Sequence, residues 1–287
     1  MEVYYSFILF GLGLAVGSFL NVLICRYDPE KNLFAFSPLT GRSRCMHCDT
    51  ELRWFELIPV ISFFIQRGRC RKCNARISFQ YPIVELLTAL IFVYVPGGVG
   101  LAYPYFHVSP FEQVLWVVVF LLLLMIAVID FRKTIIPDEA TLVLAAIGAV
   151  IIVLHGQDFG ITRGSFLGSY SLLFGWRENI FVNHALAAAL AVLFFGILIV
   201  VTRGRGMGMG DLKLAGALGV VFGWPDAIII VGVAFVLGSV VALAEILRRK
   251  KGMKSYLPFG PFLSAASAVV FFSGFSLLQW YFVLFSL

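Results

Sequence analysis

The sequence predicts an all-α polytopic membrane protein with about eight transmembrane helices and a small cytoplasmic four-cysteine domain. Three observations point to this fold class. Of the 287 residues, 60% are hydrophobic and only 13% are charged, whereas charged residues make up about a quarter of a typical soluble domain. The apolar residues are gathered in long runs. One polar segment, residues 25–80, separates the first two runs and contains two pairs of cysteines.

The apolar runs approach the roughly 20 residues that a helix needs to cross the hydrocarbon core of a bilayer. The first run, 3–24, has no basic residues before it and no small-residue cleavage site after it. We therefore expect a retained transmembrane helix rather than a signal peptide. No convincing internal repeat relates the runs. The further runs, of which 211–224 is short, cover residues 82–97, 113–129, 140–155, 183–202, 211–224, 227–247 and 257–285.

Charge distribution predicts the orientation of the chain. The segment 25–80 holds ten of the 22 Lys and Arg residues, and the positive-inside rule places such a segment in the cytoplasm. The alternation of spans then places Arg132, Lys133, Arg203 and Arg205 on the same side and both termini outside. We expect membrane lipids with anionic headgroups as partners of the basic residues, and no nucleic acid.

Two aspartates lie where apolar runs meet the cytoplasmic edge. Asp130 ends the third run, and Asp211 begins the sixth directly after Gly208 and Gly210. A carboxylate in or near a span is costly and is a candidate functional group, and glycines permit positive φ and close backbone approach. The alternative is that each aspartate caps a helix or pairs with a neighbouring cation such as Lys213.

Four of the five cysteines in residues 25–80 form the pattern C-x2-C-x21-C-x2-C, namely Cys45, Cys48, Cys70 and Cys73. Four thiolates in two such pairs fit a closed tetrahedral zinc site, and a cytoplasmic location disfavours disulfides. Free or redox-active thiols are the alternative. Because the segment has few candidate core residues, we expect a metal to supply folding energy and chelation to loosen the domain.

The two aspartate motifs resemble the signatures of the type IV prepilin leader peptidases, the bacterial branch of the GxGD aspartyl proteases. The resemblance extends in family order over nearly the whole chain. One departure is Met46, where the family usually has proline. The stretches that carry the resemblance are GSFLNVLICR (17–26), ELIPVISFF (56–64), ISFQYPIVELLTAL (77–90), IDFRKTIIPD (129–138), GMGMGDLKLAGALG (206–219) and LPFGPFL (257–263).

The resemblance implies a function for each part of the chain. Asp130 and Asp211 would form the catalytic pair, with Gly208 and Gly210 in the active-site loop. The enzyme would reside in the bacterial inner membrane and remove the short basic leaders of type IV prepilins or pseudopilins. It would then N-methylate the new N-terminal residue with S-adenosylmethionine, and Gly68 matches a position linked to methylation in the family.

These implications also divide the chain. They give a first transmembrane helix (1–24), a zinc-binding, methyltransferase-associated domain (25–80) and a transmembrane aspartyl peptidase domain (81–287). Acidic residues that could bind a basic leader are Asp49, Glu51 and Glu56.

Two other function classes fit part of the sequence. Paired carboxylates in a glycine-interrupted helical bundle also suit the ion pathway of a transporter. Their common position at one membrane edge and the cysteine domain count against that reading. A zinc-stabilised membrane scaffold is a third possibility, and it leaves the aspartates and glycines without a role.

Overall fold

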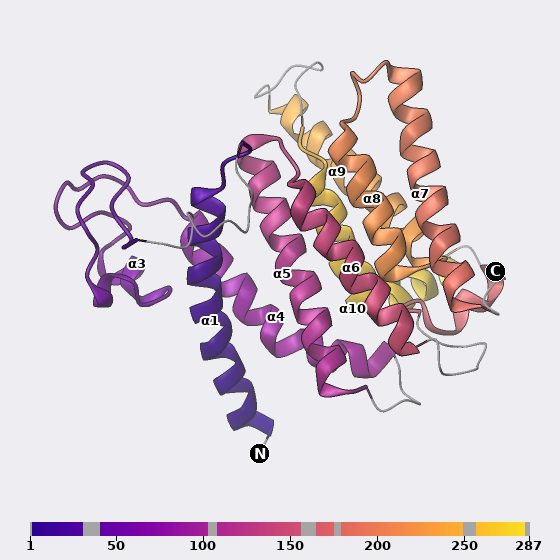
Figure 1. The fold of residues 1–287 in the computed structure, drawn as a ribbon, viewed down its shortest axis with the longest axis horizontal. Coiled ribbons are helices and arrows are strands. Elements are labelled where there is room, and N and C mark those ends of the chain that lie inside the picture. The colour runs from indigo at the N-terminus through magenta and orange to yellow at the C-terminus, as the bar shows by residue number, and fades with distance from the viewer. Residues whose placement is uncertain are drawn as a thin grey trace. The chain divides into compact units, whose positions relative to one another are not determined.

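The computed structural model describes residues 2–30, 41–102, 108–155, 165–174, 179–248 and 257–284. Within these ranges the regular structure is helical, and the only β pairing consists of two isolated bridges in the cysteine segment. The chain divides into two compact units, Met1–Gly97 and Gly98–Leu287, which Figure 1 shows in successive colours from indigo to yellow.

The first unit contains two long helices and the cysteine segment between them. The long helices are α1 (Glu2–Arg26) and the main part of α4 (Gln80–Ala102), and the segment carries the short helices η1 (Trp54–Glu56) and α3 (Ile61–Ile65). A Cβ at Gly13 would lie 2.6 Å from the Cα of Ala89, and one at Gly17 would lie 2.7 Å from the Cα of Glu85. These small residues therefore let the backbones of α1 and α4 approach closely, as in other membrane helix pairs.

In the described residues of the second unit, five α-helices form a bundle with the short helix α8. Helix α8 packs against α6, α7 and α9, while α10 packs against α5 and α9. A Cβ at Gly219 would lie 2.4 Å from the Cα of Ala188, so α7 and α8 touch through their backbones. The elements are α5 (Pro110–Lys133), α6 (Asp138–His155), the 3₁₀ helix η2 (Gly168–Phe174), α7 (Ile180–Thr202), α8 (Met209–Phe222), α9 (Asp226–Leu247) and α10 (Gly260–Leu284).

Aromatic side chains fill the part of this bundle that lies far from the aspartates along α5 and α8. The indole of Trp116 contacts three phenylalanine rings, with ring centroids 5.2 to 5.5 Å apart. Trp116 is 1% exposed, and Phe222 is 2% exposed. Buried aromatic rings of this size contribute strongly to core packing, and here they fix α5, α8 and α10 relative to one another.

The structure confirms the predicted all-helical membrane fold. Each of the eight apolar runs coincides with one helix, with ends that differ by five residues or fewer. Six of the described helices are long and apolar enough to cross a membrane: α1, α4, α5, α7, α9 and α10. Helix α8 has only 14 residues, or about 21 Å at 1.5 Å per residue, which is less than the hydrocarbon thickness of about 30 Å.

Candidate active site and metal centre

Asp130 lies in the last turn of α5, where the start of α10 meets it. Its side chain is buried, with only 4% of the residue exposed. The backbone N–H of Gly260 donates a hydrogen bond of 2.9 Å to Oδ2 of Asp130. A Cβ at Gly260 would lie 2.7 Å from the same oxygen. Glycine is therefore required for the backbone N–H at the start of α10 to approach the carboxylate, and the positive end of the helix dipole there favours a negative charge.

Asp211 is the third residue of α8 and is also buried, with 6% exposed. Its Oδ2 accepts a hydrogen bond of 3.1 Å from the backbone N–H of Gly208, the residue that precedes the helix. Asp211 therefore does cap its helix, as the alternative interpretation proposed. Lys213, however, pairs with Asp138 through an Nζ–Oδ2 distance of 2.6 Å.

A tight turn brings the two aspartates into one site. Thr134 adopts a left-handed conformation after α5, and its N–H donates to the carbonyl oxygen of Asp130 at 2.7 Å. The chain then places buried Ile136 against Gly210, where a Cβ would lie 3.0 Å from the Cβ of Ile136. This contact joins the turn after Asp130 to the first turn of α8, which carries Asp211.

Among the glycines before Asp211, the positive φ occurs at the end of α7 and not next to Asp211, where we expected it. Of the four glycines in this run, only Gly204 has a positive φ, of 72°. Its N–H bonds to the carbonyl of Ile199, and the N–H of Arg203 bonds to the carbonyl of Val200, which is the Schellman ending of α7. The left-handed residue of this motif is Arg203, with φ of 52°, and Gly204 follows it. Gly208 has an extended conformation with φ of −91°, and Gly210 provides close approach within α8. The run thus ends one helix and permits tight packing of the next.

The four predicted metal ligands lie together in the first unit. The Sγ atoms of Cys45, Cys48, Cys70 and Cys73 all lie within 4.8 Å of one another. Cys45 Sγ and Cys73 Sγ are 3.8 Å apart, which matches the separation of about 3.8 Å between sulfurs that each lie about 2.3 Å from a tetrahedral zinc ion. Hydrogen bonds with the hydroxyl and backbone of Thr50 lower the pKa of the Cys48 thiol to about 6. This favours the thiolate, which is the form that binds metal. The four cysteines can therefore hold a metal ion.

The two cysteine pairs are a short structural repeat. In the first, the N–H of Cys45 bonds to the carbonyl of Thr50, and the N–H of Asp49 bonds to the carbonyl of Cys45. In the second, Cys70 pairs with Ala75 and Asn74 with Cys70 in the same way. Asp49 and Asn74 both have positive φ, which aspartate and asparagine tolerate better than most residues. This repeat is not recognisable in the sequence because each copy spans only eight residues, Arg44–Glu51 and Arg69–Arg76.

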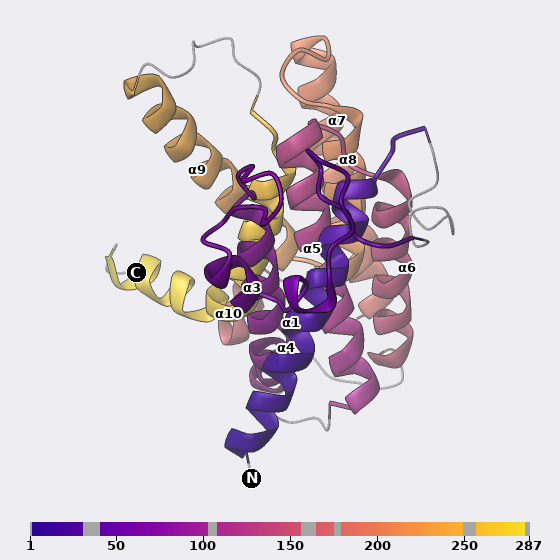
Figure 2. The same cartoon turned by 90° about the vertical axis from the view of Figure 1, so that its left-hand side faces the viewer.

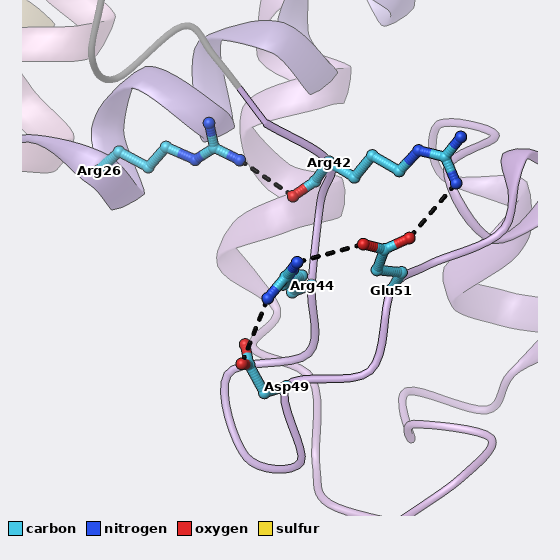
Figure 3. Close-up of polar contacts among 5 residues, drawn as sticks. All are labelled: Arg26, Arg42, Arg44, Asp49 and Glu51. Carbon is cyan, nitrogen blue, oxygen red and sulfur yellow. Dashed lines mark hydrogen bonds and ion pairs between the residues drawn. The ribbon is translucent and has the colours of Figure 1, made fainter.

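The acidic residues considered for a basic leader already have basic partners. Arg44 bridges Asp49 and Glu51 at 3.5 and 3.1 Å, and Arg42 contacts the other oxygen of Glu51 at 3.3 Å. Figure 3 shows this network reaching the end of α1, where Arg26 donates to the carbonyl of Arg42. Glu56 lies 3.9 Å from Arg71. The network therefore orders the segment around the first cysteine pair.

Gly68 has a conformational role next to the third cysteine. Its φ is +65°, and its N–H bonds to the carbonyl of Phe63 while that of Arg67 bonds to the carbonyl of Phe64. This is a Schellman ending of α3. A Cβ at Gly68 would also lie 3.1 Å from the ring of Phe63. Gly68 is thus a turn glycine that ends α3.

Comparison with known proteins decides the family of this site. The model of the bacterial peptidase A24 N-terminal domain matches residues 11–96, and that of the type IV leader peptidase family matches residues 117–243. The prepilin leader peptidase/N-methyltransferase of Aeromonas hydrophila is 32% identical over 97% of this chain and 94% of its own length. The chain belongs to the type IV leader peptidase family.

Other relatives with the same printed name match less closely or over a shorter length. The protein from Legionella pneumophila is 27% identical over 97% of this chain and 95% of its own length. The protein from Myxococcus xanthus is 35% identical over 64% of this chain but only 52% of its own length. No solved structure matches the chain. In this chain, the N-terminal family model falls within the cysteine-containing unit, and the peptidase family model falls within the aspartate-containing unit.

Two residues of these sites were not singled out from the sequence. Gly260 contributes through its backbone N–H, and a backbone donor 130 positions from its acceptor leaves no mark in composition or spacing. Glu85 lies inside the second apolar run and is 6% exposed. The rule that an ionisable residue inside a span is a candidate functional group could have identified Glu85.

Proposed function

We propose that this chain is a membrane-embedded aspartyl endopeptidase that removes the short basic leader of type IV prepilins or pseudopilins after glycine. The same chain would then N-methylate the new N-terminal residue, as the printed name of its relatives states for them. The observation that carries the peptidase proposal is the pair formed by Asp130 and Asp211. Both carboxylates are buried, both lie at helix ends, and each accepts a backbone N–H.

The chemistry follows from two carboxylates whose charges repel. Since both cannot ionise easily, the pair retains one proton. The ionised member takes a proton from a water molecule as the water oxygen attacks the scissile carbonyl carbon. The protonated member donates its proton to the carbonyl oxygen, and collapse of the tetrahedral intermediate then delivers a proton to the leaving amine. The proton belongs to the pair and not to one residue.

The backbone donors give this pair a fixed geometry. Gly260 and Gly208 each bind the Oδ2 atom of one aspartate, which limits rotation of both carboxyl groups. Because the donors belong to the first turn of α10 and the residue before α8, packing of the bundle positions the reacting oxygens. Preorganised groups of this kind avoid rearrangement during the reaction.

The cysteine cluster is proposed to bind Zn²⁺ through Cys45, Cys48, Cys70 and Cys73. The ion would be structural, with four protein ligands and no open position, and it would supply folding energy to the segment. S-adenosylmethionine is proposed as the methyl donor because relatives are named N-methyltransferases. Gly68 is a candidate for this second reaction in addition to its role in the turn.

The proposed location is the bacterial inner membrane. The basic residues of 25–80 favour a cytoplasmic cysteine domain, with both termini outside. The domain limits 1–24, 25–80 and 81–287 remain our assignment of first transmembrane helix, zinc domain and peptidase domain. Membrane lipids and prepilins are the proposed partners, without a role for nucleic acid.

The test is the intact mass of a prepilin after incubation with purified protein and S-adenosylmethionine. Wild-type protein should yield a product that has lost its leader and gained one methyl group. Asp130→Asn and Asp211→Asn should each reduce the cleavage rate by about 10²–10⁴-fold, the usual contribution of a positioned acid or base.

Asp138→Asn is the matched control, because Asp138 is a carboxylate at the adjoining helix start whose side chain is 65% exposed. This variant should retain cleavage. Full activity of Asp130→Asn or Asp211→Asn would remove that residue from the pair. Leader loss without methylation would restrict the proposal to a peptidase, and absence of cleavage by folded wild-type protein would contradict it.

A further inference from the structure

The short helix α3 has an apolar face that remains exposed among the described residues of its own unit. Ile61, Phe64 and Ile65 are spaced i, i+3, i+4 and therefore share one face of the helix. They are 54%, 67% and 64% exposed. The opposite side carries Phe63, which is 7% exposed and lies 5.1 Å from the ring of Phe79. The face formed by Ile61, Phe64 and Ile65, here called the α3 face, would be polar on an ordinary surface helix.

One hydrogen bond shows at which level of the long helices α1 and α4 the short helix α3 begins. The backbone N–H of Val60, which directly precedes α3, donates to Oε2 of Glu85 at 2.7 Å. Glu85 is five residues inside α4, which is about 7.5 Å at the usual helical rise. It lies against Gly17, nine residues before the end of α1 at Arg26. The start of α3 is therefore level with membrane-spanning parts of both helices.

The ribbon views agree with this level. In both views α3 lies beside α1, at a height between the two ends of that helix (Figures 1 and 2). These elements all belong to the first unit.

The same bond explains the buried Glu85. Where irregular backbone enters a bilayer, its N–H groups need partners inside the protein, because the hydrocarbon supplies none. Val60 has φ of 61°, a conformation that a β-branched residue rarely adopts. The carboxylate thus satisfies an N–H at a point where the chain turns sharply before α3.

We propose that the α3 face docks into the lipid bilayer beside α1 and α4. Ile61, Phe64 and Ile65 would enter the interfacial and upper acyl region of one leaflet. Exposed Arg67 and Arg69 follow directly and would contact anionic headgroups. Amphipathic helices with apolar and basic residues arranged in this way lie in the membrane interface. The cysteine domain would thereby be anchored to the membrane by a third point besides the two long helices.

The test replaces Phe64 with the photoreactive residue p-benzoylphenylalanine in the full-length protein. The protein is placed in nanodiscs of phosphatidylethanolamine and phosphatidylglycerol, irradiated and analysed by intact mass. Phe64 should gain the mass of a phospholipid. The positive control is Phe7, which is 71% exposed within a spanning helix, and the matched negative control is Met46, which is 70% exposed beside Cys45.

A lipid adduct at Phe64 and Phe7 but not at Met46 is the expected result. The proposal is overturned if Phe7 acquires lipid and Phe64 does not. It is also overturned if Phe64 links instead to a second copy of the chain or to an added prepilin. This readout needs no enzymatic activity, so failure of the proposed function would not change it.

Discussion

The surroundings of the two aspartates are densely packed, whereas the cysteine segment has almost no core. Asp130 and Asp211 lie on helices whose buried residues include Ile129 and Leu214, which are 1% and 0% exposed. Between residues 41 and 79, Phe63 and Cys70 are the only buried residues. The aspartates are thus positioned by apolar packing and backbone donors, and the cysteines by short turns, ion pairs and their common position around a metal site.

This difference indicates how each region responds to change. A packed helix end transmits a displacement of a fraction of an ångström to the group that it positions. A segment with little core depends instead on the stabilisation that a metal supplies. Substitutions in the two regions should therefore have different effects. Those near the aspartates should lower catalysis, and those at the cysteines should unfold the cysteine segment.

The largest expected effect is loss of the metal from the cysteine segment. Cys48→Ser should lower zinc content and remove hydrogen-exchange protection from residues 41–79, because zinc contributes about 10–16 kcal/mol of apparent free energy in small zinc domains. Protection in α5 and α8 should persist. Cys25→Ser is the matched control, since Cys25 lies outside the cluster and contacts the hydroxyl of Tyr81 at 3.4 Å. Undiminished protection of the segment after zinc loss would mean that its ion pairs suffice.

The next effect concerns the glycine that contacts Asp130. Gly260→Ala places a methyl group 2.7 Å from Oδ2 of Asp130, so the carboxylate or the start of α10 must shift. Since a misplacement of about 1 Å can cost about 10²-fold in rate, kcat for leader removal should fall by about 10–10²-fold with little change in KM.

The matched control for this variant is Gly232→Ala in α9, where a Cβ would have no neighbour within 4 Å. It should keep the wild-type rate. Equal kcat for Gly260→Ala and wild type would show that the first turn of α10 does not position Asp130.

A smaller effect is expected where the turn after Asp130 meets α8. Gly210→Ala places a Cβ 3.0 Å from the Cβ of Ile136, and such overpacking costs about 1–3 kcal/mol. Cleavage rate and thermal stability should fall together. The double variant Gly210→Ala/Ile136→Ala should recover part of the rate, because it removes the opposing side chain. No recovery would place the defect elsewhere.

The smallest effect belongs to the ion pair between Lys213 and Asp138. Their side chains are 46% and 65% exposed, and exposed pairs contribute about 0–1 kcal/mol. Lys213→Met should therefore change kcat by less than about fivefold. A loss comparable to that of Asp211→Asn would assign Lys213 to the catalytic machinery. Cleavage rates of Lys213 and Asp138 variants would then show whether Lys213 acts through the ion pair or directly on the reaction.

The sequence predicted those features that depend on local composition. The helices were found because each long apolar run has one compatible structure in a membrane. Asp130 and Asp211 were found because charges interrupt apolar runs, and the cysteines because their spacing is specific. The cluster of four sulfurs agrees with these predictions, and the catalytic role of the two aspartates stays a prediction.

Features that depend on long-range backbone contacts could not be predicted. The donor Gly260 and the bond between Val60 and Glu85 join positions far apart in the chain. The conformations in the glycine run also required the structure, because Gly204 and Gly208 share a residue type and differ in φ. The packing of neighbouring helices, rather than the residue type, decides which glycine adopts a positive φ.

The most direct test of the central claim, that the aspartate pair and the cysteine domain act separately, uses Asp211→Asn with two substrates. One is an intact prepilin, and the other is a pilin whose leader has already been removed. With S-adenosylmethionine present, intact mass should show the prepilin unprocessed and the mature pilin carrying one methyl group. Cleavage of the prepilin at the wild-type rate, or loss of methylation in a folded, zinc-loaded variant, would contradict the account.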